Sequence, residues 1–123
     1  MVVRPHSHAM TESDYITELR ARWPQDCDAT LETVALADEA VRVFPRSAQL
    51  WCIHGDLIQL GPESSPHSLD DARASYQRAT EIDPQFIEAW ESLGHFHNAV
   101  LDDETTAQRF FSEAERLRGH HVA

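Results

Sequence analysis

Apolar and small residues recur along the chain with the period of an α-helix. Trp51, His54, Gly55 and Ile58 stand at positions i, i+3, i+4 and i+7, which places them on one helix face. Prolines interrupt such runs, because the residue before a proline avoids the helical region. The pattern predicts an all-α chain. Its helices are expected over residues 11–22, 28–43, 47–60, 68–82, 86–100 and 104–118.

The helical pattern repeats at a fixed interval. Four residue types recur 39 positions apart: Ala40 and Ala79, Pro45 and Pro84, Trp51 and Trp90, Gly55 and Gly94. A shorter match recurs after 35 positions and joins Ala72, Tyr76 and Ala79 to Ala107, Phe111 and Ala114. Identities of this kind at one interval indicate repeated units. The chain is predicted to hold three two-helix units, over about residues 11–46, 47–85 and 86–119, between a flexible tail at 1–10 and a short tail at 120–123.

The repeat resembles the tetratricopeptide pattern, Trp-x2-Leu-Gly-x2-Tyr, then Ala-x3-Phe and Pro, in about 34 residues. Trp90-x2-Leu93-Gly94-x2-His97 follows it, with histidine in place of tyrosine. The resemblance covers about residues 28–119 and implies a right-handed superhelical stack of three antiparallel helical hairpins. Two departures stand out. The second unit carries about five extra residues between Gly61 and Asp71, and Pro24 is expected to shorten the first helix.

The resemblance also implies that the first helix of each unit lines a concave groove. Two polar stripes with the same spacing fall at these positions, each opposite a tryptophan. They consist of Gln49, Cys52, Asp56 and Gln59 in one helix and Glu88, Glu91, His95 and Asn98 in the next. A plain solvated face is the alternative interpretation. Some relatives grip a carboxylate terminus with basic groove residues, whereas carboxylates here favour a basic or amphipathic partner segment.

Charge narrows the choice of partner. The chain has 123 residues, of which 10 are basic and 21 acidic, and its formal net charge is -11. Such a surface repels phosphate groups, so neither nucleic acid nor an acidic membrane surface is expected to bind. No apolar run approaches the roughly 20 residues of a membrane span. The two cysteines, Cys27 and Cys52, are typical of reduced thiols in a cytoplasmic protein.

Candidate catalytic and metal chemistry is sparse. No glycine-rich phosphate loop or Gly-x-Ser-x-Gly motif is present, so neither an enzyme nor a cofactor is expected. His95 and His97 lie two residues apart and face different sides of a helix, which disfavours a metal site; His54 and His97 are expected to fill hairpin interiors. A weaker metal alternative combines Cys52 and Asp56 with His95. Four further histidines lie near the chain ends: His6, His8, His120 and His121.

The expected function is that of a protein–protein interaction scaffold or adaptor with an acidic groove. The alternatives are a small acidic secretion or assembly chaperone for one dedicated client and, less favoured, an enzyme with an unrecognised site. Phe110 and Leu117 form an i, i+7 stripe on the last helix that no following hairpin covers, which suggests a weak homodimer. In the other interpretation Phe110 folds down beside Trp90 or Val100.

Overall fold

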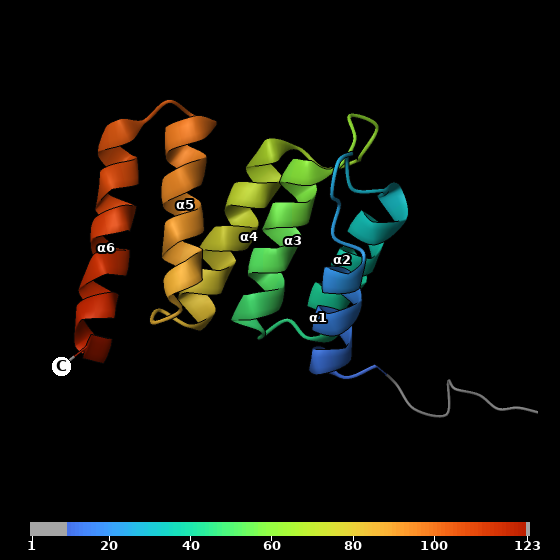
Figure 1. Ribbon diagram of the computed structural model, residues 1–123, viewed down its shortest axis with the longest axis horizontal. Coiled ribbons are helices and arrows are strands. Elements are labelled where there is room, and N and C mark those ends of the chain that lie inside the picture. Colours follow the sequence, from blue (N-terminus) through green and yellow to red (C-terminus); the bar gives the residue numbers. More distant parts are fainter. Residues whose placement is uncertain (1–9, 123) are drawn as a thin grey trace, which may run out of the picture.

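The computed structural model describes residues 10–122, with side chains up to Gly119, and these residues form six helices and no strand. The all-α class is therefore confirmed, and α3 to α6 run alternately up and down (Figure 1). The expected tail residues 1–9 and 123 lie outside the described residues. The helices are α1 (Glu12–Ala21), α2 (Leu31–Val43), α3 (Ala48–Leu60), α4 (Leu69–Ile82), α5 (Ile87–Ala99) and α6 (Glu104–Val122).

Side-chain caps explain where two of the helices begin. The hydroxyls of Thr11 and Ser68 accept hydrogen bonds from the backbone N–H three residues later. The carboxylates of Asp14 and Asp71 accept in return from the backbone N–H of the two cap residues. Each pair forms a capping box, which satisfies backbone donors that a helix start leaves unpaired. Asp71, in the first turn of α4, therefore stabilises the start of that helix.

The 39-residue interval of the sequence reappears as repeated structure. Helices α3 and α5 both begin and end 39 residues apart. The indole nitrogens of Trp51 and Trp90 each donate to the carbonyl oxygen of the proline six residues earlier, over 2.9 and 2.8 Å. The tryptophans and prolines of the repeat thus make the same contact at the start of α3 and at the start of α5.

Glycines allow the last two helix pairs to approach closely. An ideal Cβ on Gly55 would lie 2.7 Å from Cε1 of Tyr76, and one on Gly94 would lie 2.5 Å from Cε1 of Phe111. Because both distances are far below van der Waals contact, only glycine leaves room for the aromatic ring at these positions. The same glycine–aromatic contact brings α3 close to α4 and α5 close to α6.

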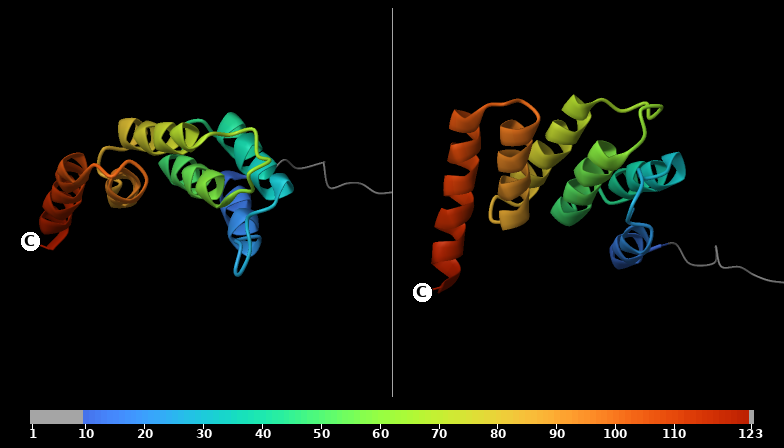
Figure 2. Two further views of the ribbon diagram at one scale, coloured as in Figure 1. Left: turned by 90° about the horizontal axis from the view of Figure 1, so that it is seen from above. Right: turned by 45° about the horizontal axis from the view of Figure 1, so that its top comes forward.

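The helices form two rows that share a continuous core. Figure 2 shows α1, α3 and α5 toward one side and α2 and α4 toward the other. Within the described residues the backbones of α1 and α3 and of α3 and α5 approach each other closely, whereas those of α2, α4 and α6 do not. One hydrophobic cluster joins α1, α2 and α3, another joins α3, α4 and α5, and Trp51 packs against both.

Some boundaries differ from the prediction. Met10 packs against the core although it was expected in the flexible tail. The α3–α4 turn, residues 61–68, is four residues longer than the α5–α6 turn, residues 100–103, which is close to the roughly five extra residues expected between Gly61 and Asp71. Helix α6 continues to Val122, into the expected tail, because glycine weakens a helix by only about 1 kcal/mol and Gly119 does not end it. None of the described helices is long and apolar enough to cross a membrane.

Candidate functional site

Helices α1, α3 and α5 meet around a small cavity. It has a volume of about 200 Å³, and residues of α1 and α3 and the start of α5 form its walls. Half of the predicted groove residues line it: Gln49, Cys52, Asp56 and Glu88. Its other walls are Arg20, Trp23, Ile53 and Phe86, so the cavity combines carboxylates with two aromatic surfaces.

Asp56 is the carboxylate most deeply held in this cavity. The hydroxyl of Tyr76 donates to Asp56 Oδ1 at 2.5 Å, and Gln59 donates to the same hydroxyl oxygen at 2.6 Å. Burial raises the pKa of Asp56, the bond from Tyr76 partly offsets this, and the negative charge of Glu88 raises it further. Burial also raises the pKa of Cys52 to about 12. Ionised Asp56 and Glu88 would attract a cation in this cavity, and the guanidinium of Arg20, which also lines it, would partly oppose that attraction.

The other predicted groove residues have different surroundings. Glu91 forms an ion pair with Arg118 of α6. The ring of His95 lies edge-on against that of Phe111, with centroids 5.0 Å apart. Asn98 borders a wider open cavity of about 980 Å³ formed with α6. These three residues lie on α5, and Gln59, which is bonded to Tyr76, lies on α3. None of the four lines the small cavity.

The expectation that Phe110 and Leu117 form an uncovered stripe is wrong. Leu117 is only 5% exposed. Phe110 is half-buried and packs against Trp90, with ring centroids 6.0 Å apart, and against His97, at 5.2 Å. The cause is the close packing of α6 on α5, which buries Leu117 and about half of Phe110. The reason for expecting self-association through these two residues therefore no longer holds.

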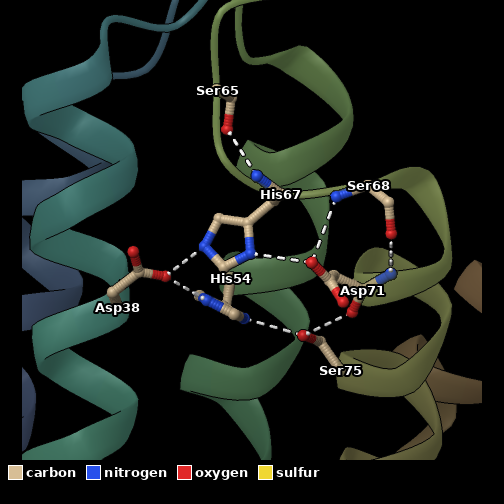
Figure 3. A network of polar contacts seen from close by, with 7 residues as sticks. All are labelled: Asp38, His54, Ser65, His67, Ser68, Asp71 and Ser75. Atoms are coloured by element: carbon tan, nitrogen blue, oxygen red, sulfur yellow. Dashed lines mark hydrogen bonds and ion pairs between the residues drawn. The ribbon is translucent and has the colours of Figure 1, made fainter.

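A second polar cluster lies on another face of α3 and joins three segments (Figure 3). Asp38 of α2 accepts at Oδ1 from Nε2 of His54, at 2.7 Å, and from Nε2 of His67, at 2.8 Å. The Nδ1 atoms of these two imidazoles lie 2.7 Å from Ser75 Oγ and 3.1 Å from Asp71 Oδ2 respectively. Both ring nitrogens of each histidine therefore have a polar partner.

The environments of the two histidines shift their pKa values in opposite directions. Burial lowers the pKa of His54, and its bond to Asp38 offsets this only in part. Burial acts in the same direction on His67, but hydrogen bonds to Asp71 and Asp38 outweigh it and raise the pKa of His67. The cluster thus contains one imidazole that favours the neutral form and one that is stabilised as a cation.

The histidine predictions were right about burial and incomplete about partners. His54 and His97 are 6% and 8% exposed, which confirms their interior positions. Neither ring nitrogen of His97 has a hydrogen-bond partner within the described part of the chain, and Asp103 Oδ2 lies 3.8 Å from its Nδ1. The cluster around His54 was missed, and the i, i+4 spacing of His67 and Asp71 was its one local signal.

Comparison of the chain with models of known protein families and with curated proteins finds no match. Function is therefore inferred from the residues and contacts of this chain.

Proposed function

We propose that the protein is a tetratricopeptide-like interaction module that binds a basic or amphipathic segment of a partner protein along α1, α3 and α5. The observation that carries the proposal is the convergence of Asp56 and Glu88, from adjacent first helices, on one cavity with aromatic walls. Trp23 and Phe86 offer contact area for the apolar part of such a segment, and the carboxylates attract its basic part.

The proposed architecture is a right-handed superhelical stack of three hairpins. It is supported by the equal spacing of α3 and α5, by the repeated tryptophan–proline bonds and by the repeated glycine–aromatic contacts. Repeat scaffolds of this kind bind partners on the extended concave surface that their curvature creates. Two free cysteines, Cys27 and Cys52, accord with a reducing compartment, and we place the protein in the cytoplasm.

Binding of peptides that differ only in charge tests the proposal. Fluorescent peptides of equal length and equal apolar content, ranging from acidic to basic, are titrated with the full chain while anisotropy is followed. Basic peptides should bind more tightly than acidic ones, and their affinity should fall as salt is raised, because salt screens exposed charges. Equal affinity for acidic and basic peptides would overturn the proposed partner chemistry.

Charge-neutralising variants locate the binding surface. Glu88→Gln should weaken binding of a basic peptide about fivefold, the effect of losing roughly 1 kcal/mol of attraction. Glu32→Gln is the matched control, because it removes the same charge from an exposed position on α2, which contributes no residue to the cavity. Glu91 is unsuitable because its substitution would also break the ion pair with Arg118. Equal loss in the two variants would show that the groove is not used, and binding only to a long unfolded segment would favour the chaperone.

A further inference from the structure

We propose that Asp38, His54 and His67 form a binding site for a divalent transition-metal ion, of which Zn²⁺ fits the ligands best. The three residues come from α2, from α3 and from the turn before α4. Each offers one ligand atom, and these atoms lie within 4.8 Å of one another. The site is separate from the acidic cavity, so it goes beyond the proposed function and does not depend on it.

The spacing of the ligand atoms suits a tetrahedral ion after a small adjustment. With bonds of about 2.0–2.1 Å, tetrahedral Zn²⁺ holds its ligand atoms about 3.3 Å apart. Asp38 Oδ1 now lies 2.7 and 2.8 Å from the two Nε2 atoms, so these contacts must open by roughly 0.5 Å. The side chain of Asp38 is 40% exposed, which leaves it room to rotate.

The outer contacts of both imidazoles match those of metal-bound histidines, which donate their other N–H to an oxygen acceptor. A metal on Nε2 of His54 requires the proton on Nδ1, which then donates to Ser75 Oγ at 2.7 Å. The Ser75 hydroxyl can pass its own proton donation on to the carbonyl oxygen of Asp71 at 3.1 Å. Nδ1 of His67 donates directly to the Asp71 carboxylate (Figure 3). The fold therefore already supplies acceptors for both metal-bound tautomers.

The ligand types select the class of ion. Two imidazoles and one carboxylate suit Zn²⁺ and neighbouring transition metals, whereas Mg²⁺ and Ca²⁺ prefer oxygen ligands alone. Three protein ligands leave one tetrahedral position open. A cavity of about 370 Å³ borders His54 and His67 and is also lined by Trp51 and Arg78. Asp38 does not line this cavity, but its side chain is 40% exposed, so water can reach the open position beside it.

The metal would join the first and second units. Asp38 belongs to α2, the last helix of the first unit, whereas His54 and His67 belong to the second. The turn that carries His67 is the one with four more residues than its counterpart between α5 and α6. The longer turn places the imidazole of His67 against α2. The extra residues therefore allow this turn to supply the third ligand of the site.

Zinc titration of the full chain tests the proposal. The four histidines at the ends would bind metal independently, so the parent protein carries asparagine in place of His6, His8, His120 and His121. Isothermal titration at neutral pH should show one Zn²⁺ per chain. At a free Zn²⁺ concentration of a hundred times Kd, Tm should rise by roughly 10 °C, because the ion binds the folded chain alone.

Matched variants assign the ligands. His67→Asn and Asp38→Asn should each reduce Zn²⁺ affinity by at least about a hundredfold, and Asp71→Asn, which can still accept from the Ser68 backbone N–H, by about 10–100-fold. His95→Asn is the control, since it removes an exposed imidazole on α5 and should leave affinity unchanged. Bound Co²⁺ should give the visible spectrum of a tetrahedral site in the parent and lose it in His67→Asn.

Two results would overturn the metal site. One is a parent protein that binds no Zn²⁺ with a Kd below about a millimolar. The other is equal Zn²⁺ affinity in the parent and in His67→Asn, which would place the ion elsewhere. His67 lies in a turn and is partly exposed, so its variant should keep the helical circular dichroism of the parent. Neither result bears on peptide binding in the acidic cavity.

Discussion

Replacement of three helical glycines by alanine would separate helix propensity from packing. Gly55, Gly94 and Gly119 all lie inside helices. In a helix interior alanine is more stable than glycine by about 0.8–1.0 kcal/mol. Propensity alone therefore predicts that all three substitutions raise the free energy of unfolding, with the smallest gain at Gly119 because it lies near a helix end.

The contacts at each position predict that the three substitutions change the free energy of unfolding in different directions. A Cβ at Gly119 meets no atom within 4 Å, so Gly119→Ala should raise the free energy of unfolding by roughly 0.5–1 kcal/mol. A Cβ at Gly55 or Gly94 would overlap an aromatic ring. Overpacking costs about 1–3 kcal/mol, so after the gain in propensity each substitution should lower the free energy of unfolding by up to about 2 kcal/mol.

Gly55→Ala should be the more damaging of the two, although its overlap is the smaller. The ring of Tyr76 that faces Gly55 is completely buried, and its hydroxyl is held by Asp56 and Gln59. The ring of Phe111 that faces Gly94 is only partly buried and belongs to the terminal helix. It can shift outward, which relieves part of the strain.

Urea denaturation followed by circular dichroism measures the three differences in the free energy of unfolding. For a chain of this size, 1 kcal/mol corresponds to a shift of about 4 °C in Tm. Unchanged m-values would confirm that the variants unfold over the same buried surface. A Gly55→Ala variant as stable as the wild type would refute the packing argument, since the ring would then have moved freely.

Three other predictions concern buried polar groups. His97→Leu should raise the free energy of unfolding, measured by urea denaturation, by about 1 kcal/mol, because it removes ring nitrogens without partners in the described chain. A lower free energy of unfolding would show that solvent hydrogen-bonds to the ring. Burial raises the pKa of Asp56, so the folded chain binds this proton more tightly and loses stability as pH rises from about 4 to neutrality. Asp56→Asn should therefore raise Tm at neutral pH but not near pH 3, and an equal gain at both would contradict this cause. A thiol reagent at neutral pH should label exposed Cys27 rapidly and buried Cys52 only after unfolding, since burial raises the pKa of Cys52 to about 12. Equal labelling rates at the two cysteines would contradict the burial of Cys52.

Local signals in the sequence were sufficient for the helices and for part of the site. Helical periodicity, prolines and N-terminal caps act over a few residues, so the six helices fall close to their predicted ranges. The spacing of Gln49, Cys52 and Asp56 placed them on one face of α3, and the structure brings them to one cavity with Glu88. The same periodicity placed His54 and His97 in the interior.

The partners of these residues were decided only by the tertiary structure. The bonds from Asp38 to His54 and His67 join residues 16 and 29 positions apart, and Glu91 meets Arg118 across 27. Such contacts depend on how helices pack and on the course of the longer turn, and a helical period carries no information about either. For the same reason, the repeat pattern could not show that α6 packs down on α5 and buries Leu117.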